Sequence, residues 1–179
     1  MSTITNIAVP TRDQVNAESQ AIFDSLKSQI GMVPNLYATI GYSSSALSNF
    51  LAFSNEAGKG TFSAKEIEAI KLAVSDANNC VYCKSAHTAI GKLNGFTDEE
   101  TVALRKAEIE DSKLNALTSL ARAVAENAGH VSDEVKENFF AQGYDEKALI
   151  DFVAVVAAVT FTNYVHGVTQ VPVDFPVVE

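Results

Sequence analysis

Residues 63–95 read SAKEIEAIKLAVSDANNCVYCKSAHTAIGKLNG. Ser63, followed three positions later by Glu66, forms a capping-box pattern that predicts a helix beginning at residue 64. Apolar residues then recur at helical spacing, so this helix should run to about residue 77. Asn78 or Asn79 suits the N-cap of a second helix, which we expect to continue to residue 94, with Gly95 just beyond its end. The stretch therefore predicts two consecutive helices joined by a short turn.

The same helical period extends towards both ends of the chain. Further helices are predicted over residues 14–30 and 44–58, from a second capping box at 97–100, and over 114–128, 132–141 and 146–164. The last of these is the most apolar, which is typical of a central or interface helix. No alternating strand pattern occurs, and residues 171–178, rich in proline and β-branched residues, should form a docked tail. We therefore predict an all-α fold, a compact bundle of about seven or eight helices.

The bulk composition is that of a single ordinary globular domain covering residues 1–179. Hydrophobic residues make up 47% and charged residues 20% of the chain, and the net charge of −9 argues against binding to nucleic acid or to an anionic membrane. The N-terminus lacks the basic and apolar regions of a signal peptide, and the longest apolar run, 152–161, is too short to span a bilayer. We therefore expect a cytoplasmic protein.

The chain has two cysteines, Cys80 and Cys83, and His87 follows four residues after the second. In the cytosol a Cys-x-x-Cys pair is more often catalytic or metal-binding than a structural cross-link. If Asn79 is the N-cap, Cys80 lies in the first helical turn, where the helix dipole favours a thiolate. His87 would lie on the same face as Cys83 and could take its proton. The dipole thus favours Cys80 as the attacking thiol and the histidine favours Cys83, and we prefer Cys83 while both stay open.

A histidine base needs a partner that orients it, and the preceding helix offers Glu66, Glu68 and Asp76. Spacing alone does not choose among them, although Glu66 is already used by the capping box. A second interpretation of the motif is a metal site with the two cysteines, His87 and Glu68 as ligands, since zinc accepts this set. A third is a scaffold that has lost its chemistry.

Two neighbouring residues receive structural interpretations. Tyr82, between the cysteines, is expected to serve packing. His166, near the end of the most apolar helix, is expected to be a helix-dipole partner or an interface residue rather than a ligand. The apolar stripe of that helix, from Phe152 to Val159, should be core or subunit interface.

The whole motif has a known counterpart. The quoted segment, with Glu68 twelve positions before Cys80 and a Cys-x-x-Cys-x-x-x-His pattern, resembles the alkyl hydroperoxidase D-like members of the carboxymuconolactone decarboxylase superfamily. Residues 31–37 and 161–176 resemble the upstream and closing segments of its stand-alone members. The resemblance implies an all-helical fold of that type that assembles as a homo-oligomer, a trimer or hexamer. We expect no cofactor and no resident metal.

The resemblance also implies a thiol peroxidase or disulfide reductase cycle with Cys83, Cys80, His87 and Glu68 as the catalytic residues. Glu68, His87 and Cys83 would form a proton relay. A hydroperoxide would oxidise Cys83 to a sulfenic acid, Cys80 would close a disulfide, and the substrate could also be a small disulfide. A lipoyl domain, a thioredoxin-like protein or a small thiol would restore the dithiol.

Two departures from the superfamily matter. Tyr82 stands where some members carry a second histidine. The decarboxylase branch typically lacks the cysteine pair, so a decarboxylase-type activity, which would survive Cys→Ser changes, remains as an alternative.

Overall fold

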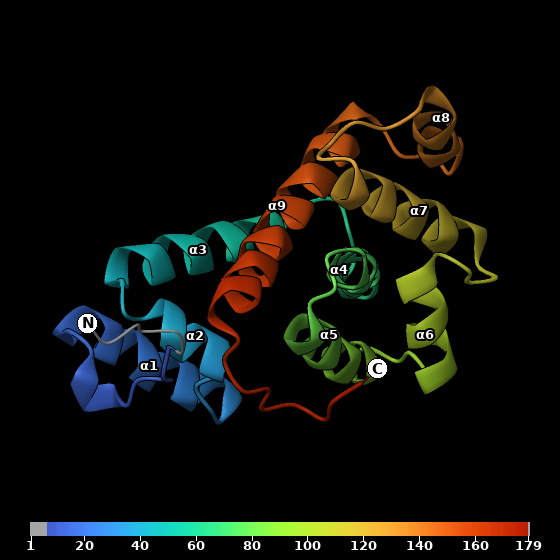
Figure 1. Cartoon of the computed structure of the whole chain (residues 1–179). Coiled ribbons are helices and arrows are strands. Elements are labelled where there is room, and N and C mark those ends of the chain that lie inside the picture. Colours follow the sequence, from blue (N-terminus) through green and yellow to red (C-terminus); the bar gives the residue numbers. More distant parts are fainter. Residues whose placement is uncertain (1–6, 179) are drawn as a thin grey trace.

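The computed structural model describes residues 7–178, which are helical and contain no strand (Figure 1). The elements in chain order are η1 Arg12–Gln14, α1 Ala17–Ile30, α2 Asn35–Ile40, α3 Ser44–Ala57, α4 Ala64–Ala77, α5 Val81–Leu93, α6 Asp98–Lys106, α7 Ser112–Glu126, α8 Asp133–Ala141 and α9 Glu146–Thr169. The predicted all-α class is confirmed. Residues 1–6, where we expect no signal peptide, and residue 179 lie outside the described residues.

The predicted capping boxes are present and fix the start of two helices. Ser63 Oγ accepts from the Glu66 N–H at 3.3 Å, and Glu66 Oε2 accepts from the Ser63 N–H at 2.9 Å, so α4 begins at Ala64. Thr97 and Glu100 form the same reciprocal pair at the start of α6. These signals are local, so the sequence alone was sufficient to place them.

Two elements differ from the sequence-based expectation. The structure has nine α-helices in residues 7–178, rather than seven or eight, because the six-residue α2 was expected to be part of a turn. A helix this short shows no apolar period that a sequence pattern could reveal. The last helix continues past residue 164 to Thr169, where Gln170 stops it with a left-handed backbone, φ 52°.

The main core surrounds α4, which Figure 1 shows enclosed by α5, α6, α7 and α9. Ile70 and Val74 of α4 meet Leu117 of α7 and Phe152 and Val155 of α9, and all five are fully or almost fully buried. The predicted core role of the α9 stripe is therefore confirmed. Burial on this scale is the main favourable term in folding.

The outer face of α9 remains apolar and exposed. Ile150 is 69%, Val153 47%, Tyr164 63% and Val168 81% accessible. By length and composition alone α9 could cross a membrane, and it is the one such helix in the described part of the chain; 44% of its most apolar window is buried inside the protein. The estimate from the shorter run 152–161 therefore understated the apolar length of this helix.

A second core cluster joins the N-terminal helices to the cysteine motif. Phe23 of α1, Leu36 of α2 and Leu47 of α3 pack in it with Cys80, Tyr82, Cys83 and Val171. The predicted docked tail is confirmed, since Asp174 Oδ2 accepts from the Asn35 N–H at 2.8 Å and the Val178 N–H donates to Ser85 Oγ at 3.2 Å. The tail thus joins α2 to α5, and its Val171 lies in the cluster that holds both cysteines.

Candidate functional site

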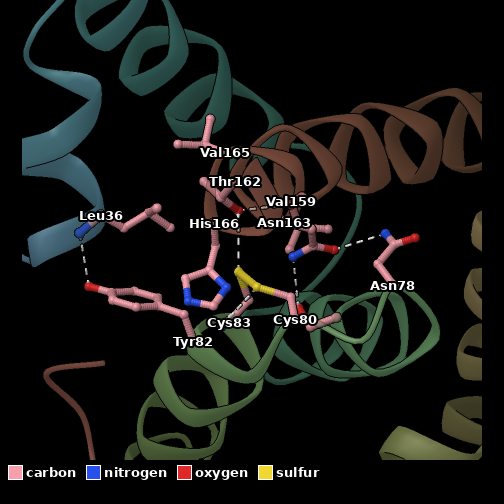
Figure 2. The surroundings of a disulfide bond; sticks show 12 residues. Leu36, Asn78, Cys80, Tyr82, Cys83, Val159, Thr162, Asn163, Val165 and His166 are labelled. Carbon is pink, nitrogen blue, oxygen red and sulfur yellow. Dashed lines mark hydrogen bonds between the residues drawn. A yellow bond between two sulfur atoms is a disulfide. The ribbon is translucent and has the colours of Figure 1, made fainter. Parts of the chain in front are cut away.

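The two cysteines lie at the start of α5 and form a disulfide, with their Cα atoms 5.3 Å apart (Figure 2). Each is 2% exposed, so the pair lies beneath the surface between α4, α5 and α9. The fold therefore allows the sulfur atoms to bond directly, which is the first requirement of a redox-active pair.

The start of α5 corrects one sequence-based prediction. Cys80 itself is the N-cap, and its Sγ accepts from the Cys83 N–H at 3.2 Å. Neither predicted candidate is the cap: Asn79 adopts a left-handed backbone with φ 53°, and Asn78 ends α4. Asparagine tolerates this conformation better than most residues, so it makes the tight turn between the helices. Cys80 therefore precedes the first helical turn, whereas Cys83 lies within it.

Glu68 and His87 are brought together on one side of this motif. His87 Nδ1 lies 2.8 Å from Glu68 Oε2, and Lys71 Nζ lies 3.1 Å from Glu68 Oε1. Glu68 is 4% exposed. Burial raises the pKa of Glu68, but the charge and hydrogen bond of His87, together with Lys71, outweigh it and lower the pKa to about 2. A carboxylate only accepts hydrogen bonds, so Nδ1 of His87 carries a proton.

The other two carboxylate candidates are engaged elsewhere. Glu66 accepts from Ser63 in the capping box and from the Tyr144 hydroxyl at 2.7 Å. Asp76 pairs with Arg122 at 2.9 Å and with Lys84 at 3.4 Å. Glu68 is thus the candidate that the structure places against His87.

The expected hydrogen bond between His87 and Cys83 is not present in the described residues. In the described residues 7–178 no hydrogen bond joins His87 to either sulfur, and the ring contacts Glu68 instead. The polar atom beside Cys83 Sγ is Thr162 Oγ1 of α9, at 4.0 Å. Sequence spacing on α5 could not reveal this neighbour, because it approaches from another helix.

Helix α9 contributes three polar side chains that sequence reasoning did not assign to the site. Thr162 donates to the Val159 carbonyl at 2.8 Å, and Asn163 donates to Ser75 Oγ at 3.3 Å and accepts from Asn78 at 2.9 Å. His166 lies one turn after Thr162 and is 8% exposed, with its ring 5.5 Å from that of Tyr82. The sequence did contain a signal for these site residues, because Thr162, Asn163 and His166 are polar residues within the most apolar helix.

Tyr82 makes specific hydrogen bonds in addition to its packing contacts. Its hydroxyl donates to Asp174 Oδ1 at 2.6 Å and accepts from the Leu36 N–H at 3.2 Å, so it ties α5 to α2 and to the tail. Burial and the Asp174 carboxylate both raise the pKa of Tyr82, which keeps the phenol neutral. Phe175 packs edge-on against the same ring at 5.7 Å.

A groove of about 900 Å³ lies between α1, α3 and α4. Its walls are largely apolar, with Ile22, Leu26 and Leu51 among them, and Glu68 and Lys71 reach it. Neither cysteine lines the groove. The groove therefore gives solvent access to Glu68, the hydrogen-bond partner of His87.

The described residues contain no preformed set of ligands for the metal site that the sequence also allowed. In residues 7–178 no group of three or more His, Cys, Asp or Glu side chains is arranged to hold a metal ion. In the disulfide form the sulfur atoms bond to each other, and a zinc site would need them as separate thiolates.

Comparison with known proteins identifies the family of the motif-bearing segment. Residues 45–127 match the carboxymuconolactone decarboxylase family, which confirms the resemblance predicted from the sequence. A search of curated proteins found no significant match.

Several solved structures share the fold. A peroxidase-related protein from Silicibacter sp. TM1040 superposes with a TM-score of 0.81 at 22% identity, covering 99% of this chain and 93% of the other. An uncharacterized peroxidase-related protein from Ralstonia eutropha JMP134, described as an alkylhydroperoxidase AhpD core, gives a TM-score of 0.79 at 22% identity, covering 93% of this chain and 90% of the other. The debrominase Bmp8, in complex with 2,3,4-tribromopyrrole, gives 0.79 at 20% identity, covering 97% and 93%. At these identities the likeness establishes the fold.

Proposed function

Because residues 45–127 belong to the carboxymuconolactone decarboxylase family and carry an intact cysteine pair, we propose that this protein is a thiol-dependent peroxidase or disulfide reductase. The observation that carries the proposal is the buried Cys80–Cys83 disulfide at the start of α5, the helix that also places His87 Nδ1 2.8 Å from Glu68. Two cysteines at this spacing can pass between dithiol and disulfide repeatedly.

The proposed cycle needs Cys83, Cys80, a hydroperoxide and an external reductant. The Cys83 thiolate attacks one oxygen of the hydroperoxide, the O–O bond breaks, and an alcohol leaves once its oxygen is protonated. The Cys80 thiol then attacks the Cys83 sulfenic acid, an S–S bond forms, and water leaves. A lipoyl group, a thioredoxin-like protein or a small thiol supplies two electrons and two protons to restore the dithiol.

The N-terminal position of both cysteines supports a reactive thiolate. Cys83 lies in the first turn of α5, where the free N–H groups and the helix dipole stabilise negative charge. The Cys83 N–H already points at Cys80 Sγ, at 3.2 Å. Both sulfurs therefore benefit from the helix start, and our choice of Cys83 as the attacking thiol rests on its place within the first turn of α5.

Glu68 and His87 suit a relay that moves protons between solvent and the site. The Glu68 carboxylate holds Nδ1–H of His87, which leaves Nε2 as the nitrogen that accepts and returns a proton. Because no hydrogen bond joins His87 to a sulfur in the described residues, this relay would reach Cys83 through water. The groove at Glu68 and Lys71 gives the relay its access to solvent and substrate.

We also propose that the protein is a cytoplasmic homo-oligomer, a trimer or hexamer. The exposed apolar face of α9, with Ile150, Val153, Tyr164 and Val168, supports a second copy of the chain as the occupant of that face. Apolar stripes of this kind on one helix are typical of subunit interfaces.

The test of the proposed function is steady-state turnover with a hydroperoxide and a dithiol reductant. We expect the wild-type protein to consume the hydroperoxide and Cys83→Ser to be inactive. A decarboxylase-type activity that survives Cys83→Ser would overturn the proposal. A brominated pyrrole, offered in parallel because the fold is shared with a debrominase, tests the same dithiol on a different electrophile, and turnover of that compound alone would replace the peroxidase assignment.

A further inference from the structure

The buried imidazole of His166 is a titratable group that the proposed cycle does not use. His166 is on α9, four residues and one turn after Thr162, whose hydroxyl lies 4.0 Å from Cys83 Sγ. Residues four apart share a helix face, so His166 faces the same region of α5 as Thr162. Figure 2 shows its ring between the Tyr82 ring and the sulfur atoms of the disulfide.

The groups around His166 leave one ring nitrogen available as a proton acceptor. A hydrogen bond with the backbone of Val171 engages the ring and raises its pKa, while burial, the larger effect, lowers the pKa below 6.5. The imidazole is therefore neutral at pH 7, with one nitrogen carrying a proton and the other carrying a lone pair.

The charged and titratable groups that face His166 do not compete for that lone pair. From α5 they are Cys83 and Tyr82, and the Tyr82 hydroxyl donates its hydrogen bond to Asp174 Oδ1 at 2.6 Å. From the tail the group is Asp174, which accepts from Tyr82 and from the Asn35 N–H at 2.8 Å. No ion pair involves His166 within the described residues. Cys83 thus remains as the proton source that faces the ring.

Thr162 completes the arrangement. Its hydroxyl donates to the Val159 carbonyl at 2.8 Å, so towards Cys83 it presents only lone pairs. In the dithiol form the Thr162 hydroxyl can accept a hydrogen bond from the Cys83 S–H. The same S–H can instead turn towards the neighbouring imidazole. His87 has its Nδ1 bound to Glu68, and its ring is turned towards that carboxylate.

We propose that His166 of α9, rather than His87, is the direct proton acceptor for the Cys83 thiol. This inference rests on the proposed thiol cycle. The S–H proton of Cys83 moves to the free nitrogen of His166, and the thiolate attacks the hydroperoxide. The S–O bond forms as the O–O bond breaks, and the imidazolium returns the proton to the leaving alkoxide, which departs as an alcohol. His87 and Glu68 then serve as the solvent-side relay.

The test measures how the reactivity of Cys83 depends on pH. In a Cys80→Ser background, where Cys83 is the single thiol, we would follow alkylation by iodoacetamide from pH 5.5 to 9. With His166 present, the rate should rise as the imidazole loses its proton, below pH 6.5, and then change little to pH 8. With His166→Gln the rate at pH 7 should fall about tenfold or more, and it should rise about tenfold per pH unit up to pH 8.

His87→Gln in the same background is the matched control, with His166→Asn as a second variant should His166→Gln fail to fold. The proposal predicts that the slope changes only in the His166 variants. An unchanged slope in a folded His166 variant, or a slope lost only in His87→Gln, would overturn it. Because alkylation needs no hydroperoxide, failure of the peroxidase assignment appears separately, as a wild-type protein without hydroperoxide turnover.

Discussion

Glu68 makes the stability of the protein depend on pH in a way that one substitution can isolate. Its carboxylate is 4% exposed and its pKa is held at about 2, against about 4.5 for a free glutamate. One pKa unit corresponds to about 1.4 kcal/mol, so ionised Glu68 stabilises the folded protein by roughly 3 kcal/mol at neutral pH.

The sign follows from the lowered pKa. The stabilisation is fully present above pH 4.5, where the glutamate is ionised in both folded and unfolded chains. It is lost as the pH falls towards 2, where folded Glu68 takes up its proton. Glu68→Gln cannot titrate, so the variant should be about 3 kcal/mol less stable than the wild type at pH 7, and this deficit should shrink below pH 4.5.

Urea unfolding of both proteins at several pH values between 2.5 and 7 measures the deficit. Glu56→Gln is the control, because its carboxylate is 72% exposed beside Lys59, where removal should cost well under about 1 kcal/mol. A Glu68→Gln deficit that is constant from pH 7 to pH 2.5 would refute the reasoning, because it would come from packing rather than from the ionised carboxylate.

Three further substitutions test separate parts of the structure. Cys80→Ser should leave a sulfenic acid on Cys83 after one hydroperoxide equivalent, trapped by dimedone and seen by mass spectrometry; normal cycling of this variant would remove Cys80 from the resolving role. Tyr82→Phe should lower the free energy of unfolding by about 1–2 kcal/mol, measured in urea, because the Leu36 N–H and a carboxylate oxygen lose their partner; no loss would mean that water replaces the hydroxyl. Val168→Glu should shift the mass from light scattering towards the monomer, whereas a monomeric wild type would contradict the oligomer outright.

The parts of the fold that the sequence predicted are those determined within a few residues. Ser63 with Glu66 and Thr97 with Glu100 set helix starts through reciprocal hydrogen bonds, and both positions were correct. The N-cap of α5 was wrong by one residue, because Asn79 serves the turn through its left-handed backbone and Cys80 caps the helix. A sequence pattern cannot separate these two roles of asparagine, since both favour the same residue.

The site was predictable only where its members share a short segment or a known pattern. Cys80, Cys83 and His87 were found from spacing, and Glu68 was singled out by the resemblance. Their roles remain proposals, although the structure brings Glu68 and His87 within 2.8 Å. Thr162 lies 79 residues from Cys83 in the chain, so only the packing of α9 on α5 reveals it and His166 as neighbours of the sulfur.

A free-thiol count on fully reduced, metal-free protein, before and after one equivalent of hydroperoxide, tests the central claim most directly. Metal analysis of the protein as purified belongs to the same experiment. The account predicts that both thiols disappear and that peptide mapping finds a Cys80–Cys83 disulfide within one chain. Two thiols that stay unreactive, with stoichiometric zinc in the purified protein, would contradict it and identify a metal site.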